Sequence, residues 1–256
     1  MSFKPKKKFH LPWSWSHAML RGLNRLGLSL TRISNLPKST PESLFMLLGR
    51  TGMSPTHILD IGANRAAWSK LASRFFPNVR YTLVEPQVEL ASFLEPFCAS
   101  FSDSKWIQAG VGGREEIREF VVAPFADRSS SFNTPEELRT EEHEVRDIQV
   151  VTLDSIIQQR GIPEILKIDA EGSEMEILEN SSTVLGQTEL ILIELAFFKF
   201  TEGPSFSEMI AFMAEREYEP YHFTWFNPRP HDGAPGQCEL AFAKRNGYLR
   251  AYQGWE

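Results

Sequence analysis

The sequence predicts an α/β fold in which a mostly parallel, doubly wound sheet is covered by helices on both faces. Apolar segments of strand length alternate with helix-like segments along most of the chain, which is the order that builds parallel sheets. The segment Leu190–Leu195 is almost entirely apolar, as is typical of a strand buried on both faces. A strand, a tight turn of small residues and a helix follow one another over residues 57–76, and this arrangement presents backbone N–H groups to a ligand.

The elements are expected in a regular order. After a hinge at residues 37–41, a helix begins at Pro41 and leads to the first strand. The expected strands are 57–61, 79–85, 106–111, 117–122, 148–153, 165–168 and 190–195, followed by an antiparallel pair at 221–226 and 239–243. The expected helices are 65–76, 88–98, a short one ending at Gly161, 174–180 and 205–216. The polar segment 123–146 is expected to be an excursion or lid, and no second globular domain is expected.

The composition is that of a globular protein with one substantial domain. Of 256 residues, 42% are hydrophobic and 23% are charged, which are ordinary values, and the length suits one α/β domain. Cys98 and Cys238 lack metal-binding spacing, so we expect them to pack in the interior of a protein from a reducing compartment. No apolar run approaches the ~18 residues of a membrane span, and the sequence therefore predicts a cytoplasmic protein.

Charge divides the chain into an N-terminal extension, residues 1–41, and a main domain, residues 42–256. The extension has eight basic residues and no acidic one, whereas the remainder has 19 basic and 33 acidic residues. Because affinity for nucleic acid depends on neutralising phosphates, the acidic domain is not expected to bind DNA or RNA.

The extension also has the pattern of an amphipathic helix. Apolar residues recur at three- and four-residue steps between Met19 and Ile33, and Trp13 and Trp15 follow a cluster of lysines. This combination is typical of helices at membrane surfaces, and it predicts peripheral contact of residues 1–36 with an anionic membrane. The alternative is that the helix packs on the main domain while the lysines are solvated.

The segment HILDIGANRAAWS, residues 57–69, carries the strongest signal for a ligand site. Its strand contains Asp60, and the small residues Gly62, Ala63 and Asn64 form the turn before the helix. The spacing lacks the second and third glycines of the G-x-G-x-x-G fingerprint, which disfavours a nicotinamide or flavin cofactor.

Glu85 adds a second signal at the end of the next strand, YTLVE. A carboxylate at this position can accept hydrogen bonds from the two hydroxyls of a ribose. Together with the turn after the first strand, Glu85 predicts a nucleoside-containing cofactor, and the form of the turn favours S-adenosylmethionine over NAD.

Carboxylates follow two further strands at the edge of the sheet where ligands bind in doubly wound folds. Asp169 follows one strand and Glu194 lies near the end of the next. These two could act as a general base, bind a substrate hydroxyl, or hold a divalent metal ion. Glu171 and Glu174 could interact with the dipole of the following helix, and Lys167 is expected to be a buried ion-pair partner.

Histidines and aromatic residues in the C-terminal third are further candidates. His222 and His231 could remove a proton because imidazole titrates near neutral pH. A histidine among aromatic residues is more often packed in a core, and this alternative stays open. The aromatic residues would suit stacking on a sugar or a lipid-linked ring, or a plain core; they are Phe197, Phe198, Phe200, Trp225 and Phe226.

Several of these segments together resemble the FkbM-type S-adenosylmethionine-dependent methyltransferases. The similarity covers about residues 44–197, and its most discriminating blocks are VTLDSI, residues 151–156, and LKIDAEG, residues 166–172. The resemblance implies the seven-stranded, Rossmann-like fold of class I methyltransferases. It also implies O-methylation of sugar or polyketide hydroxyls.

The resemblance further implies roles for individual residues. Asp60, Gly62, Ala63 and Asn64 would line the methionine side of the cofactor, Glu85 would hold the ribose and Pro86 would shape the adenine edge. Gly110, in the third strand, is also assigned to the cofactor site. Asp169, Glu171 and Gly172 match the acidic block of the family.

One position departs from the family pattern. The family usually has glycine where this chain has Ala66. Alanine at the start of a helix is tolerated if φ stays negative, and its methyl group leaves slightly less room beside the cofactor.

The sequence thus predicts a single-domain S-adenosylmethionine-dependent methyltransferase acting on a hydroxyl of a sugar, glycolipid or polyketide-type acceptor. Two alternatives stay open. The first is a non-catalytic binding or scaffold protein with the same fold, for which Ala66 leaves room. The second is another sugar-modifying enzyme with a nucleoside cofactor, such as NAD.

Overall fold

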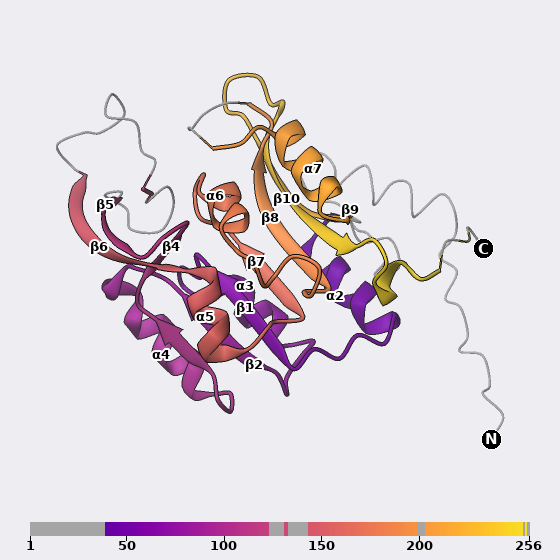
Figure 1. Cartoon of the computed structure of the whole chain (residues 1–256), viewed down its shortest axis with the longest axis horizontal. Coiled ribbons are helices and arrows are strands. Elements are labelled where there is room, and N and C mark those ends of the chain that lie inside the picture. Colours follow the sequence, from indigo (N-terminus) through magenta and orange to yellow (C-terminus); the bar gives the residue numbers. More distant parts are fainter. Residues whose placement is uncertain (1–38, 123–130, 133–142, 199–202, 253, 255–256) are drawn as a thin grey trace, which may run out of the picture. The chain divides into compact units, whose positions relative to one another are not determined.

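A seven-stranded sheet forms the centre of the computed structural model, which describes residues 39–122, 131–132, 143–198, 203–252 and 254 (Figure 1). Its strand order is β3-β2-β1-β7-β8-β10-β9. The first five of these strands are parallel, and β10 is antiparallel to both β8 and β9. The strands are β1 (His57–Ile61), β2 (Arg80–Val84), β3 (Lys105–Ile107), β7 (Ile165–Ile168), β8 (Leu190–Ala196), β9 (Tyr218–Pro228) and β10 (Pro235–Lys244). The predicted seven-stranded, mostly parallel sheet is confirmed.

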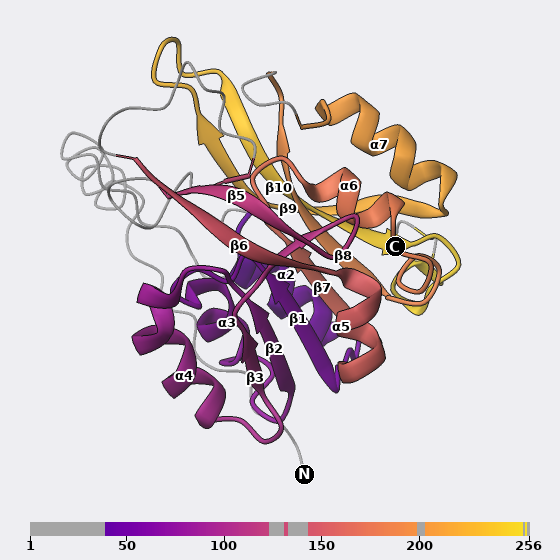
Figure 2. The ribbon, with the colours of Figure 1, turned by 60° about the vertical axis from the view of Figure 1, so that its left-hand side comes forward.

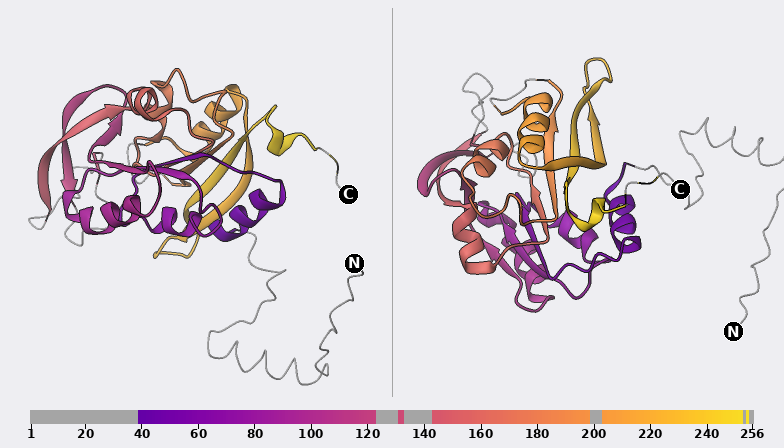
Figure 3. Two further views of the ribbon diagram at one scale, coloured as in Figure 1. Left: turned by 90° about the horizontal axis from the view of Figure 1, so that it is seen from below. Right: turned by 45° about the vertical axis from the view of Figure 1, so that its right-hand side comes forward.

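Helices cover both faces of this sheet (Figures 2 and 3). They are α2 (Pro41–Arg50), α3 (Ala67–Ala72), α4 (Ala91–Ala99), α5 (Leu153–Arg160), α6 (Glu174–Glu179) and α7 (Phe206–Glu215). One buried apolar cluster joins α2, α3 and α4 to the sheet, and a second cluster joins α5, α6 and α7 to it. Ile58 belongs to the first cluster and Leu59 to the second, because successive side chains of a strand point to opposite faces.

A second, three-stranded sheet branches from the edge of the main sheet. It consists of β4 (Gly110–Gly112), β5 (Glu116–Val122) and β6 (Glu144–Thr152) in the order β4-β6-β5. The single strand predicted at 106–111 is therefore wrong, since the chain pairs with β2 only as far as Ile107 and then joins β6. The glycines of β4 permit this close pairing, because a Cβ on Gly112 would lie 2.9 Å from a methyl group of Val150.

The helix predicted at residues 65–76 is shorter than expected. α3 begins at Ala67 because Asn64 and Ala66 have left-handed backbones, with φ of 47° and 56°. The condition of a negative φ, under which alanine would be tolerated at position 66, is not met. Two left-handed residues so close together interrupt the helix and form a compact turn between β1 and α3.

Some predictions fall on residues outside the described ranges. Most of the N-terminal extension, for which the sequence predicts an amphipathic helix, lies there, as does most of the predicted excursion at 123–146. The predicted boundary at 41/42 falls directly after the first residue of α2. The N-terminus of this helix has a capping box formed by Thr40 and Ser43. In the described part of the chain, no helix combines the length and apolar character needed to cross a membrane.

Candidate functional site

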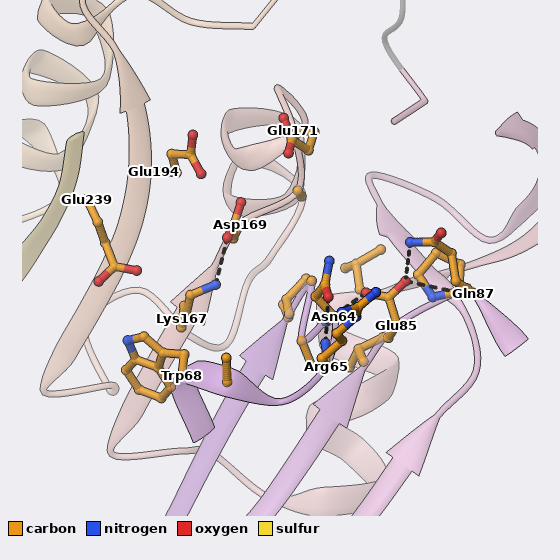
Figure 4. Close-up of a pocket in the computed structure, with 18 of the residues that line it drawn as sticks. Asn64, Arg65, Trp68, Glu85, Gln87, Lys167, Asp169, Glu171, Glu194 and Glu239 are labelled. Carbon is orange, nitrogen blue, oxygen red and sulfur yellow. Dashed lines mark hydrogen bonds and ion pairs between the residues drawn. The ribbon is translucent and has the colours of Figure 1, made fainter. Parts of the chain in front are cut away.

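A cavity of about 840 Å³ opens at the carboxyl ends of the parallel strands (Figure 4). Residues that follow β1, β2 and β7 form one side, a residue of β8 lies at the centre, and the β9–β10 hairpin forms the opposite wall. Doubly wound sheets bind ligands at this edge. The structure brings most of the predicted site residues together here.

The turn after β1 is fixed by backbone contacts. The N–H groups of Gly62 and Ala63 both donate to the carbonyl of Val84, at 3.0 and 3.1 Å. Gly62 has a φ of 71°, and a Cβ there would lie only 1.8 Å from the carbonyl oxygen of Asp169. Only glycine fits this position. Gly62, Ala63 and Asn64 all line the cavity, as the sequence predicts.

Glu85 lies beside this turn and is only 4% exposed. Its Oε2 accepts the N–H of Asn64 at 2.9 Å, and its Oε1 accepts the backbone and side-chain N–H groups of Gln87 at 3.1 and 3.2 Å. Burial raises the pKa of Glu85, and these hydrogen bonds oppose the rise. Glu85 and Pro86 both line the cavity.

Gly110 lines the cavity at the start of β4. A Cβ on Gly110 would lie 2.3 Å from the ring of Phe132, so this aromatic ring packs directly on the glycine. Phe132 also contacts Phe120 edge-to-face with 5.0 Å between ring centroids. These two rings give the Gly110 end of the cavity an apolar wall that the sequence analysis did not identify.

Lys167 is the buried cation of the site, with 5% of its surface exposed. Its ammonium group lies 2.9 Å from Asp169 and 3.7 Å from Asp60. Burial alone would lower the pKa of Lys167, but the charges of Asp169 and Asp60 hold it above its usual value. Burial would likewise raise the pKa of Asp169, yet Lys167 holds it below its usual value. The predicted buried ion pair is confirmed.

Asp60 does not line the cavity, in contrast to the role that the resemblance implies. Its side chain is fully buried, and its Oδ2 accepts the hydroxyl of Ser69 on α3 at 2.5 Å. Because β1 places this side chain against α3, the hydrogen bond to Ser69 connects the strand to the helix. Asp60 also forms an ion pair with the ammonium group of Lys167.

Glu194 on β8 lies near Asp169 and lines the cavity. Its Oε1 accepts the side-chain N–H of Gln237 at 2.6 Å. Burial and, second, the negative charge of Asp169 raise the pKa of Glu194 to about 10. At neutral pH the site therefore holds an ionised Asp169 beside a protonated Glu194.

The β9–β10 hairpin contributes a polar and aromatic wall; the sequence analysis named Trp225 as a stacking candidate but missed the polar residues. Trp225, Asn227, Gln237 and Glu239 all line the cavity. The Asn227 amide donates to Gln237 at 3.1 Å, which extends the hydrogen-bonded chain from Glu194. Glu239 pairs directly across from Glu194 in the antiparallel ladder. The alternation of Gln237 and Glu239 in an otherwise apolar strand is the signal that could have identified them.

The block Asp169–Gly172 forms a tight turn before α6. Asp169 and Glu171 line the cavity, and Gly172 has a φ of 102°. The sequence suggested that Glu174 interacts with the helix dipole. The structure places Glu174 in the first turn of α6, and its carboxylate also accepts backbone N–H groups of the preceding turn.

Neither candidate histidine lines the cavity. The Nε2 of His222 lies 3.3 Å from the hydroxyl of Ser43 at the start of α2, and burial lowers the pKa of His222. His231 lies in the exposed loop of the hairpin. The structure therefore places His222 in packing between β9 and α2, and its predicted catalytic role is not retained.

The described acidic residues of the site give no support to a metal centre. Among the described residues, no group of three or more His, Cys, Asp or Glu side chains could hold a metal ion. Asp169 is neutralised by the ammonium of Lys167 at 2.9 Å, and Glu194 is held in its protonated form by burial and the charge of Asp169. The arrangement gives no support to the predicted metal site at Asp169 and Glu194.

Solved structures with a similar fold include several methyltransferases. Magnesium protoporphyrin IX methyltransferase from Synechocystis PCC 6803 has 7% identity and a TM-score of 0.46, with 80% of this chain and 77% of that chain covered. Precorrin-6y C5,15-methyltransferase from Geobacter metallireducens has 13% identity and a TM-score of 0.43, with 79% and 88% covered. The 1,6-didemethyltoxoflavin-N1-methyltransferase of Burkholderia thailandensis has 11% identity and a TM-score of 0.41, with 94% and 93% covered.

No curated protein matches the sequence. The model of the methyltransferase FkbM domain, however, matches residues 60–220. This range covers more than half of the chain and includes the turn after β1, the acidic turn after β7 and most of the cavity wall. The chain belongs to the FkbM methyltransferase family.

Proposed function

We propose that the protein transfers a methyl group from S-adenosylmethionine to a hydroxyl of a sugar, glycolipid or polyketide-type acceptor. The observation that carries this proposal is that one cavity joins two different walls. One wall has the glycine turn and Glu85 expected of a nucleoside cofactor site. The other has an ionised carboxylate, two amides and an exposed indole, groups suited to a polyhydroxylated acceptor.

The residues of the first wall fit S-adenosylmethionine. A carboxylate has about four lone-pair sites, and Glu85 uses three of them, for Asn64 and Gln87. Oε2 therefore retains a site for one ribose hydroxyl. The turn at residues 62–64 would lie along the methionine portion, and Pro86 and Gly110 would lie at the adenine edge.

Ala66 does not obstruct this wall. It is fully buried and is not one of the residues that line the cavity. The expectation that its methyl group takes room beside the cofactor is therefore wrong, and the position gives no support to a non-catalytic scaffold.

Asp169 is the best-placed acceptor for the proton of the substrate hydroxyl. S-adenosylmethionine supplies a methyl group bound to a sulfonium sulfur. The acceptor oxygen attacks the methyl carbon in line at near-contact distance, and S-adenosylhomocysteine leaves. Asp169 is ionised because Lys167 holds its pKa low, so an Oδ atom can orient the hydroxyl and receive its proton. Glu194 keeps its own proton and shares a side-chain hydrogen bond with Asp169, which also lowers the pKa of Asp169.

The hairpin wall suits the rest of the acceptor. Trp225 is 41% exposed and lines the cavity, so one face of its ring is free to stack on a sugar. Asn227 and Gln237 supply amide groups in an orientation fixed by their mutual hydrogen bond and by Glu194. The carboxylates of Asp169 and Glu171 favour a neutral acceptor over an anionic one.

The proposal is tested with Asp169→Asn and S-adenosylmethionine labelled in its methyl group. The acceptors are a panel of methyl glycosides and lipid-linked sugars, and the label is located by NMR. We expect methyl ethers as products, and we expect turnover to fall by about 10²–10⁴ in the variant because it lacks the base. Label on nitrogen or carbon, or full activity of Asp169→Asn, would overturn this assignment.

A thermal-shift series separates the cofactor alternatives. S-adenosylhomocysteine is expected to raise the melting temperature because a ligand that binds the folded state stabilises it, whereas NAD is expected to have no effect. A shift with NAD alone would identify the protein as a different nucleoside-dependent enzyme.

A further inference from the structure

The turn that brings Asp169 into the cavity contains two consecutive residues with a left-handed backbone. Glu171 has a φ of 50° and Gly172 a φ of 102°. Because positive φ is unfavourable for a residue other than glycine, contacts elsewhere in the fold must maintain this shape. The turn is also closely confined, since the Asp169 carbonyl occupies the space that a Cβ on Gly62 would need.

Glu174, the first residue of α6, makes the contacts that maintain the turn. Its side chain is only 4% exposed. Oε1 accepts the N–H groups of Ala170 and Gly172 at 2.9 and 3.1 Å, and Oε2 accepts the N–H of Gly172 at 3.0 Å. Both amides on either side of the left-handed Glu171 therefore point at one carboxylate.

We propose that Glu174 is a positioning residue whose carboxylate holds the turn at residues 169–172 in the shape that presents Asp169 and Glu171 to the acceptor. Glu174 does not line the cavity, so it acts through the turn rather than by touching the acceptor. The inference rests on the proposed function, since it concerns how the proposed base is placed for methyl transfer.

The hydrogen bonds from the turn also favour the charged form of Glu174. Burial raises the pKa of Glu174 to about 7, whereas the N–H groups of Gly172 and Ala170 lower it.

Hydrogen exchange in Glu174→Gln tests this inference directly. The glutamine keeps the size of the side chain but replaces one acceptor oxygen with a donor and removes the charge. In the wild-type protein, the amides of residues 170 and 172 should be protected from exchange because both donate to Glu174. In the variant, exchange at these amides should be faster by at least about tenfold after correction for intrinsic exchange.

A matched control is Glu179→Gln, which removes an exposed carboxylate from the last residue of the same helix. It should leave both amides with wild-type protection. Wild-type protection in Glu174→Gln would overturn the proposal. If that variant does not fold, Glu174→Asp replaces it: the charge stays but the reach is shorter, so the same loss is expected, and wild-type protection would again overturn the proposal.

Binding of S-adenosylhomocysteine to the wild-type protein, measured by calorimetry, distinguishes failure of this inference from failure of the proposed function. Absence of binding would contradict the proposed cofactor without changing the exchange result. Binding together with unaltered exchange in Glu174→Gln would leave the proposed function intact and overturn the positioning role alone.

Discussion

Glu85 is the residue on which the proposed cofactor assignment depends most. Replacing it with alanine removes the acceptor for a ribose hydroxyl and for the N–H groups of Asn64 and Gln87. A hydrogen bond to a charged group contributes about 1.5–3 kcal/mol, so S-adenosylhomocysteine should bind at least about tenfold more weakly, as measured by calorimetry. Glu85→Gln retains one acceptor oxygen, so its affinity for S-adenosylhomocysteine should lie between those of the wild type and Glu85→Ala. Unchanged affinity in Glu85→Ala would exclude this role.

Ala66 provides a test of backbone strain. Its left-handed φ of 56° costs about 1–2 kcal/mol for an L-residue, and glycine would relieve this strain. The glycine variant loses about 0.5–1 kcal/mol of stability because its unfolded chain has greater entropy. It loses about 0.8 kcal/mol more because the buried methyl group is removed. We therefore expect Ala66→Gly to leave the free energy of unfolding within about 1 kcal/mol of wild type by urea titration.

Ala66→Val is the matched variant, and it is expected to lower the free energy of unfolding. A β-branched residue is a genuine outlier at positive φ, and the site is fully buried, so strain and overpacking should together cost more than about 2 kcal/mol. Equal stability of the valine and glycine variants would show that the turn adjusts freely.

At this scale the sequence identified residues whose role depends on position along the chain. Gly62, Glu85 and Asp169 follow strand ends, and parallel strand ends meet at one edge. The roles that the sequence suggested for Asp60 and His222 are not those that the structure shows, because they depend on which face of a strand the side chain occupies. Neither lines the cavity, and no local pattern distinguished the two faces.

Among the elements, α5 depends on Asp154, the acid of the VTLDSI block. Its carboxylate accepts the hydroxyls of Ser181, Ser182 and Thr183 at 2.6–2.7 Å and the N–H of Ser182 at 3.0 Å. This ties the first turn of α5 to the segment after α6. Asp154→Ala should lower the free energy of unfolding by roughly 2–3 kcal/mol, as measured by urea titration.

The effect of Asp154 should also depend on pH. Burial would raise its pKa, but hydrogen bonds from Ser181, Ser182 and Thr183 hold it below the usual value. A depressed pKa in the folded state stabilises the protein above the unfolded pKa of about 3.9 and loses that contribution as the pH falls below it. The difference between wild type and Asp154→Ala should therefore be full at neutral pH and shrink below about pH 4. A constant difference would contradict the charge-assisted role.

Element types were predictable because periodicity is local, whereas the partners of short strands were not. The segment at 106–111 is predicted as one strand because most of its residues are apolar. It divides between two sheets because β2 offers pairing only to Ile107 and β6 offers pairing from Gly110. Likewise, the β9–β10 hairpin is longer than its apolar core predicts, since the backbone pairing continues through its polar outer residues.

For the whole molecule, the asymmetry of charge leads to a prediction about membranes. Residues 1–36 contain seven basic side chains and no acidic one, and each basic residue near an anionic surface contributes about 1 kcal/mol. We expect the full chain to sediment with phosphatidylserine-containing vesicles, and a chain lacking residues 1–36 to remain in the supernatant with an unchanged melting temperature.

Neutral vesicles and high salt serve as controls, since both should release the full chain. Aggregation of the shortened chain, or a large fall in its melting temperature, would show that the apolar residues of the extension pack on the main domain. The membrane proposal would then have to be abandoned.

The sequence by itself determined the alternation of strands and helices, and with it the edge at which Gly62, Glu85 and Asp169 meet, because hydrophobic periodicity and strand direction are local properties. Only the tertiary structure decided that Lys167 neutralises Asp169, that Asp60 supports α3, that Gln237 and Asn227 join Glu194, and that His222 lies outside the cavity. These contacts depend on register and side-chain direction between segments far apart in the chain. Burial then sets the charge states of the acids that they bring together.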